Sequence, residues 1–190
     1  RVIHICYCVR DISLRILCIN VAISLTNQSS LVSFIIGQVY DKVLGNHFSD
    51  LFSMTNPFLY SRILVVDDEV AVCEALKQFL TNEQFTVETA VDGEDAIAKL
   101  DDFKPDVILL DIRMPYLSGK DVLKVIKYRL PDVEIIMVTA INNINTVEEC
   151  MQSGAFGYVT KPVDLNHLIK DIHSALEHRK DRLSKKNNLK

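Results

Sequence analysis

Short apolar runs alternate with helical patterns through the last two-thirds of the chain. Runs such as Arg62–Val66 and Asp106–Leu110 are rich in β-branched or aliphatic residues and bounded by polar ones. This is typical of strands that are buried on both faces of a sheet. The expected strands are residues 62–66, 85–89, 106–110, 134–138 and 156–160.

Helical spacing joins each expected strand to the next. Val72, Leu76 and Phe79 fall at i, i+4 and i+7 in the first helix. Asp92 and Asp164 are expected N-caps, and Gly154 suits the left-handed position that follows a helix. The last helix is expected to bury Leu165, Leu168, Ile169, Ile172 and Leu176. Five strands that alternate with five helices predict an α/β fold, in which helices doubly wind a five-stranded parallel sheet.

Residues 1–60 form an N-terminal extension to which no fold is assigned. Its first 53 residues are rich in Ile, Ser, Cys and Asn and show no sustained period. The chain does not begin with Met, and Met54 stands eight residues before the first strand. We therefore expect a disordered segment or one foreign to the natural protein. Targeting or membrane anchoring stays open as an alternative, although the apolar stretch 12–25 is shorter than the roughly 20 residues that span a bilayer.

Composition and charge exclude several classes of protein. The chain is 48% hydrophobic and 24% charged, which excludes wholesale disorder. Five scattered Cys have neither disulfide-framework nor zinc-site spacing, so a reducing, cytoplasmic location is expected. The net charge of −4 argues against direct binding of nucleic acid, and the basic stretch 181–190 is expected to be a C-terminal tail. The three His of the last helix, His167, His173 and His178, are assigned to its solvated face.

Polar residues stand where the expected strands end. Asp67 and Asp68 follow the first strand and Asp111 follows the third, while Thr139 and Lys161 end the fourth and fifth. Ligands of open parallel sheets bind at the carboxyl ends of the strands. These side chains are therefore expected to share one site.

Each residue type in this set has a chemical use. Clustered carboxylates repel one another and are stabilised by a hard cation, and Mg²⁺ leaves coordination positions for water or a phosphoryl oxygen. Asp111 is placed to act as a nucleophile that accepts a phosphoryl group. Lys161 and the hydroxyl of Thr139 would bind the phosphoryl oxygens.

The order and strand-end context of these motifs resemble the receiver domain of two-component response regulators over about residues 61–180. The matching segments are Ile63–Glu69, Asp106–Pro115, Gly119, Val138–Ala140 and Lys161–Pro162. The resemblance implies a flavodoxin-like (βα)5 domain that works as a signalling switch. Such a domain is no enzyme in the usual sense, because it catalyses only its own phosphorylation and dephosphorylation.

The resemblance also implies a role for each site residue. Asp111 would be the phospho-acceptor, and Mg²⁺ would be held by Asp67, Asp68, Asp111 and the backbone carbonyl of Arg113. Thr139 and Tyr158 would form the switch pair. Lys161 would bind phosphate and precede a cis peptide bond to Pro162. The side chains of Arg113 and Ile141 would flank the path of the water that removes the phosphoryl group.

The implied partners are a sensor histidine kinase or phosphotransfer protein and a downstream protein or an output domain outside this chain. A homodimer could form through the face of the fourth helix, fifth strand and fifth helix. Three alternatives stay open: a receiver-like binding module without phosphotransfer, a membrane-tethered receiver, and an Asp-nucleophile phosphatase of the haloacid dehalogenase type. The phosphatase is disfavoured, because it needs an Asp where Arg113 stands.

Overall fold

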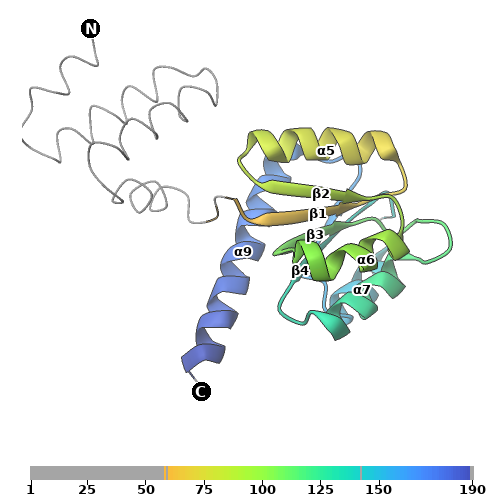
Figure 1. The fold of residues 1–190 in the computed structure, drawn as a ribbon. Helices are drawn as coiled ribbons and strands as arrows, with labels where there is room; N and C mark the ends of the chain where they lie inside the picture. The colour runs from red at the N-terminus through yellow and green to blue at the C-terminus, as the bar shows by residue number, and fades with distance from the viewer. Residues whose placement is uncertain (1–57, 59, 142, 189–190) are drawn as a thin grey trace, which may run out of the picture. The chain divides into compact units, whose positions relative to one another are not determined.

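The computed structural model describes residues 58, 60–141 and 143–188, and strands and helices alternate through this part (Figure 1). In chain order they are β1 (Arg62–Val66), α5 (Val70–Asn82), β2 (Thr86–Ala90), α6 (Gly93–Phe103), β3 (Val107–Leu110), α7 (Gly119–Arg129), β4 (Glu134–Thr139), α8 (Ile144–Gln152), β5 (Gly157–Thr160) and α9 (Leu165–Asn188). The extension predicted for residues 1–60 lies, apart from Phe58 and Tyr60, outside the described residues. In the described part, no helix has the length and apolar character needed to cross a membrane.

The strands form one parallel sheet in the order β2-β1-β3-β4-β5. The predicted five-stranded, flavodoxin-like fold is therefore confirmed. The chain winds outward in one direction from β1 to β2 and in the other from β3 to β5. The reversal between β1 and β3 is the switch point at which such sheets bind ligands.

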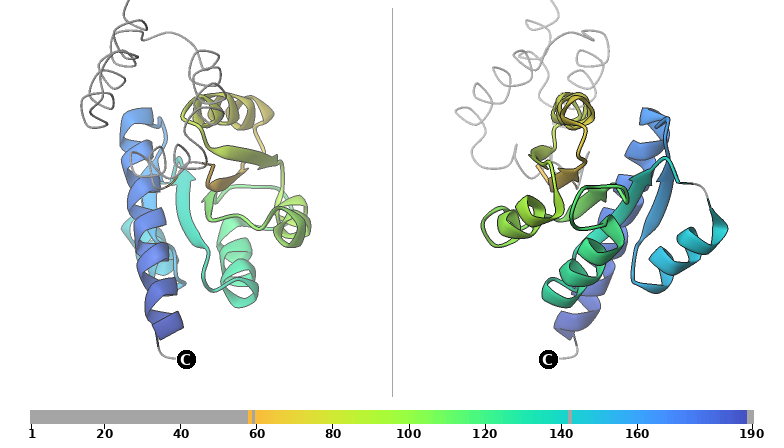
Figure 2. Two further views of the ribbon diagram at one scale, coloured as in Figure 1. Left: turned by 60° about the vertical axis from the view of Figure 1, so that its left-hand side comes forward. Right: turned by 90° about the vertical axis from the view of Figure 1, so that its right-hand side faces the viewer.

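Helices cover both faces of the sheet (Figure 2). One core cluster joins the sheet to α6, α7 and α8 through side chains such as Leu100, Leu123 and Cys150. The other joins it to α5 and α9 through side chains such as Leu76 and Ile172. Both β3 and β4 are buried along their whole length: β3 is apolar on both faces, whereas β4 carries a polar residue at each end, Glu134 and Thr139.

The helix ends follow the predicted capping residues. The carboxylate of Asp92 accepts a hydrogen bond from the Asp95 amide, and Gly154 has a φ of +97° after α8. Asp164 caps α9 by accepting hydrogen bonds from the amides of Asn166 and His167.

The prediction that Leu165 is buried is wrong, since 39% of this residue is exposed. The buried stripe of α9 begins one turn later, at Leu168, so the first turn of the helix projects past the core. The helix also continues without a break through residues 181–188, where the sequence suggested a tail.

Candidate functional site

The site lies at the carboxyl ends of β1 and β3, the two strands at the switch point. Val66 and Leu110 are paired in the sheet, and the Asp111 amide donates a hydrogen bond of 2.9 Å to the Val66 carbonyl. Asp67 and Asp111 each follow one of these paired residues, so they emerge side by side. Both are buried, at 2% and 6% exposure.

Three carboxylates meet at this edge. Oxygen atoms of Asp67, Asp68 and Asp111 all lie within 4.8 Å of one another. Asp68 is exposed, so the cluster opens to solvent on one side. The donor set is all oxygen and densely negative, which fits a hard divalent cation that keeps part of its water shell.

Lys161 brings a positive charge to the same cluster from the end of β5. Its ammonium group donates hydrogen bonds of 2.6 Å to Asp67 Oδ2 and 3.0 Å to Asp111 Oδ2, and Glu69 Oε1 lies 3.9 Å away. Burial acts to lower the pKa of Lys161, but these hydrogen bonds outweigh it and raise the pKa above its usual value. Lys161 is therefore a fixed cation. The Lys161–Pro162 peptide bond is cis, as the family resemblance implied.

Burial is the largest influence on the pKa of Asp67. It raises the pKa of this carboxyl above its usual value, although hydrogen bonds from Lys161 and the Glu69 amide act in the opposite direction. The charged form of Asp67 is thus held in a costly environment. A second cation beside it would relieve that cost.

Backbone donors fix the orientation of Asp111. Its Oδ1 accepts hydrogen bonds from the amides of Ile112 (2.6 Å) and Arg113 (3.2 Å), while Oδ2 faces Lys161. The Arg113 side chain is exposed. The loop turns so tightly that a Cβ at Gly119 would lie 1.9 Å from the Asp111 carbonyl oxygen, so only glycine fits there.

Thr139 and Tyr158 both bind the backbone of Ile141. The fully buried Thr139 hydroxyl accepts a hydrogen bond of 3.4 Å from the Ile141 amide, and the Tyr158 hydroxyl donates to the Ile141 carbonyl. Burial raises the pKa of Tyr158. The structure thus gathers Asp67, Asp68, Asp111 and Lys161 in one cluster and joins the predicted switch pair through the β4–α8 loop.

Two residues near the site were given no role from the sequence. Glu69 orients Asp67 through its amide and faces Lys161, and its only sequence signal is its place directly after the acidic pair. The Cys73 thiol donates to the Asp67 carbonyl at 3.3 Å, and burial raises the pKa of Cys73 to about 11. This cysteine therefore supports the Asp67 backbone and stays a thiol at neutral pH.

Comparison with known proteins agrees with this geometry. The family model for the response regulator receiver domain matches residues 63–173. The transcriptional regulatory protein ZraR of Salmonella typhimurium is 35% identical over 119 residues, which are 63% of this chain and 27% of that protein. The chain thus spans about a quarter of the length of such curated relatives.

Solved structures give the same result. A CheY-like receiver domain protein from Methanospirillum hungatei is 30% identical with a TM-score of 0.62, and the match covers 64% of this chain and 98% of that one. CheY in a CheX-CheY-BeF₃-Mg²⁺ complex from Borrelia burgdorferi is 31% identical with a TM-score of 0.59, over 61% and 89% of the chains. The chain therefore belongs to the response regulator receiver domain family, whose members are signalling domains of two-component systems rather than enzymes.

Proposed function

We propose that the chain is a phosphorylation-activated switch that accepts a phosphoryl group on Asp111 in a Mg²⁺-dependent reaction. The observation that carries this proposal is the pairing of Lys161 with Asp111 Oδ2 inside a cluster of three carboxylates. A carboxylate nucleophile, a fixed cation and an oxygen-rich metal site are the groups that such a transfer needs.

In the proposed reaction, Asp111 Oδ2 attacks phosphorus, because Oδ1 already accepts two backbone hydrogen bonds. An oxygen–phosphorus bond forms as the bond from phosphorus to the donor histidine nitrogen, or to the oxygen of a small acyl phosphate, breaks. Asp67, Asp68, Asp111 and the Arg113 carbonyl would hold Mg²⁺, which supplies charge neutralisation when bound. Lys161 would bind a phosphoryl oxygen, and positioning would provide most of the rate.

Thr139 and Tyr158 would transmit the effect of the phosphoryl group to the surface through a conformational change. Their shared attachment to Ile141 supports this role, because a turn of the Thr139 hydroxyl toward the phosphoryl group would break its contact with that loop. The exposed apolar side chains of Ile144 and Met151 on α8, and of Leu165 at the start of α9, support an output face formed by α8, β5 and α9. This face would bind a downstream protein or a second copy of the chain.

The proposed phosphoryl donor is a sensor histidine kinase or phosphotransfer protein. ZraR is a transcriptional regulator that is longer than this match, which supports an output domain or separate protein downstream of the receiver. The net charge of −4 supports an output through protein contacts rather than through nucleic acid bound by this chain. A cytoplasmic location is part of the same proposal.

A receiver-like binding module without phosphotransfer is the second candidate. In such a module, the ion pairs of Lys161 with Asp67 and Asp111 would hold the cluster together rather than bind a phosphoryl group. The Asp-nucleophile phosphatase has no such support, because the exposed Arg113 stands where its acid would be.

Intact-mass spectrometry after incubation with acetyl phosphate and Mg²⁺ separates the two candidates. We expect one added phosphate, which is lost with a chelator and in Asp111→Asn but kept in Asp102→Asn, an exposed carboxylate elsewhere. If the folded wild-type protein gains no phosphate from either acetyl phosphate or a purified kinase, the binding module would be favoured.

A further inference from the structure

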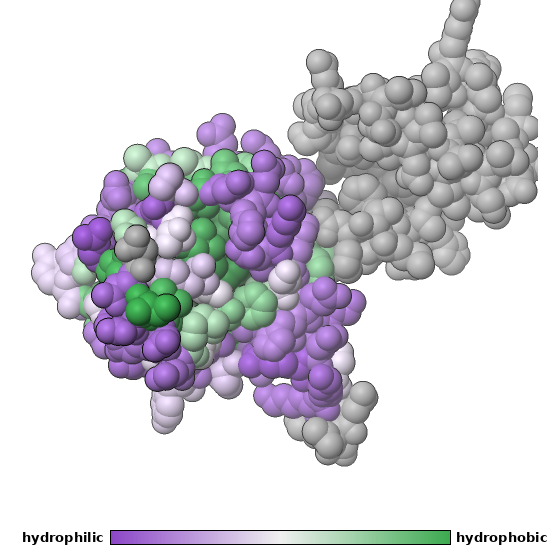
Figure 3. Space-filling view, turned by 180° about the vertical axis from the view of Figure 1, so that it is seen from behind, coloured by the Kyte–Doolittle hydropathy of each residue, from purple (hydrophilic) through white to green (hydrophobic). Residues whose placement is uncertain are grey.

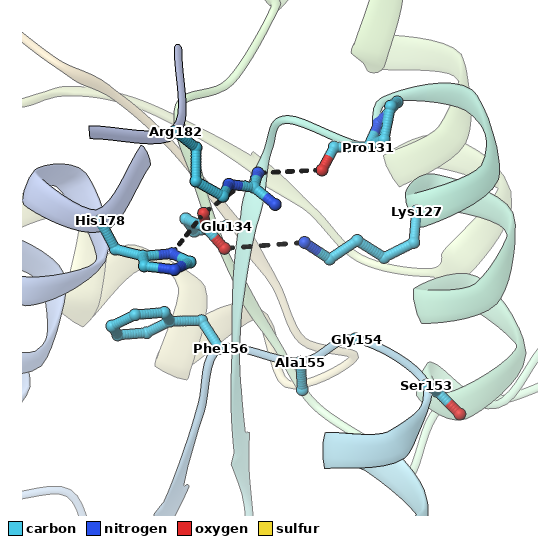
Figure 4. A pocket seen from close by; sticks show the side chains of 9 residues that line it. All are labelled: Lys127, Pro131, Glu134, Ser153, Gly154, Ala155, Phe156, His178 and Arg182. Atoms are coloured by element: carbon cyan, nitrogen blue, oxygen red, sulfur yellow. Dashed lines mark hydrogen bonds and ion pairs between the residues drawn. The ribbon is translucent and has the colours of Figure 1, made fainter. Parts of the chain in front are cut away.

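A buried carboxylate lies at the end of the sheet opposite the phospho-acceptor site. Glu134 is the first residue of β4 and only 2% exposed, whereas Thr139 ends the same strand. Its carboxylate is 3.0 Å from His178 Nδ1, 3.2 Å from an Arg182 nitrogen and 3.6 Å from Lys127 Nζ. Figure 4 shows these side chains pointing toward Glu134. Together they line an open pocket of about 520 Å³.

Two of these partners come from the last three turns of α9, where the hydrophobic core has ended. Leu176 is the last buried residue of the helix within the described part, and Figure 3 shows hydrophilic side chains over its C-terminal turns. Beyond Leu176 the apolar packing is limited to a partly buried Leu183 and a contact between the His178 and Phe156 rings, and a helical end with so little packing is marginal in water. Something other than the core must therefore hold residues 177–188 in place.

Charged contacts follow this end of the helix down to its final turns. Arg179 pairs with Asp106 at 3.1 Å and Lys186 pairs with Asp132 at 2.9 Å. Arg182 also donates a hydrogen bond of 3.0 Å to the Pro131 carbonyl. The three cations recur at spacings of three and four residues, so they lie on one face of the helix.

We propose that Glu134, Asp106 and Asp132 form a charge clamp with Arg179, Arg182 and Lys186. The clamp keeps the end of α9 helical and docked on the amino ends of β3 and β4, and so fixes the direction in which the chain leaves the receiver. None of its six residues belongs to the cluster of Asp67, Asp68, Asp111 and Lys161.

Glu134 is the anchor of the clamp. Its charge is buried, so removing its partners would leave an uncompensated carboxylate, whereas the Lys186–Asp132 pair is more than a third exposed on both sides. Exposed pairs are weak and are screened by salt. The clamp should therefore loosen from the Lys186 end first.

Hydrogen exchange of the full chain, followed by mass spectrometry, tests the clamp. We expect Glu134→Gln to speed exchange in residues 178–188 by about tenfold or more, which corresponds to about 1.4 kcal/mol of opening free energy. Asp181→Asn is the matched control, because the Asp181 side chain is exposed on the same helix and makes no hydrogen bond or ion pair with the described residues. Exchange in β1 and β3 should stay unchanged in both variants.

Two further measurements test the clamp even if Glu134→Gln destabilises the whole domain. Arg182→Gln should loosen the same segment from the helix side, and salt of about 1 M should speed exchange at residues 184–188 more than at 178–182. If Arg182→Gln and high salt both leave exchange in residues 178–188 at the wild-type rate, the clamp does not exist.

Discussion

The ammonium group of Lys161 donates a 2.6 Å hydrogen bond to Asp67, a carboxylate that a magnesium ion would also use. The lysine and a bound metal ion would therefore compete for the same carboxylate oxygens of the site. A phosphoryl group on Asp111 would give Lys161 a new partner and release Asp67. Under the proposed function, metal binding and phosphorylation would be coupled through this one side chain.

This coupling predicts opposite effects of one substitution. Lys161→Met should strengthen Mg²⁺ binding to the unphosphorylated protein several-fold, because competition for Asp67 is removed, yet slow phosphorylation of Asp111 by about 100-fold or more. Calorimetry gives the affinity and intact mass gives the rate. Lys180→Met, an exposed lysine on α9, is the control. Weaker Mg²⁺ binding in Lys161→Met would contradict the competition.

Ile141 is expected to lengthen the life of the phosphoryl group. It lies two residues after Thr139 and carries no group that orients water, so Ile141→Glu should speed loss of the phosphoryl group several-fold, and Ile141→Leu should leave the rate unchanged. The decay of phosphorylated protein after removal of the donor measures both. An equal or longer half-life in Ile141→Glu would show that this side chain does not guard the water path.

The raised pKa of Asp67 predicts how the stability of the fold should change with pH in the absence of metal. The folded state binds the proton of the Asp67 carboxyl more tightly than the unfolded chain does. The contribution of this protonation to folding stability is therefore complete below the usual pKa near 3.8, and it is lost as pH rises through the raised pKa. Asp67→Asn should therefore raise the Tm at neutral pH with chelator present. The gain should shrink as pH falls toward about 4, and a constant difference across this range would rule out Asp67 as its source.

The close approach at Gly119 predicts a steric penalty with a matched control. Gly119→Ala would place Cβ 1.9 Å from the Asp111 carbonyl oxygen, so the loop must shift, and we expect a loss of about 1–3 kcal/mol in the free energy of unfolding. At Gly157 the nearest side-chain atoms lie 3.9 Å from such a Cβ, so Gly157→Ala should cost much less. Urea unfolding compares the two. Phosphorylation should slow only in Gly119→Ala.

The sheet and the acidic cluster could be predicted from the sequence because both depend on local pattern. Apolar runs define the strands, and a parallel sheet brings their polar ends to one edge, so Asp67, Asp111 and Lys161 converge without knowledge of side-chain geometry. Their roles in phosphotransfer remain predictions.

The network around Glu134 could not be predicted in this way. His178 and Glu134 are 44 residues apart, and a histidine on the polar side of a helix has no sequence signal that separates a buried partner from water. Arg182 and Lys186 looked like part of a solvated tail for the same reason. Leu165 fits the apolar period of α9, but the core contacts the helix only from Leu168 onward, so periodicity alone placed the start of the buried stripe one turn too early.

Because α9 extends well past the core, a small change in the tilt of this helix moves its C-terminal end by a much larger distance than its buried turns. From Leu176 to Asn188 the helix rises by about 18 Å, so a tilt of about 10° around the buried turns would move its tip by about 3 Å. The ion pairs of Arg179, Arg182 and Lys186 oppose such a tilt, so the tip would move only when these pairs open. Whatever is attached at that tip would feel a slight change of angle as a displacement comparable to the width of a water molecule.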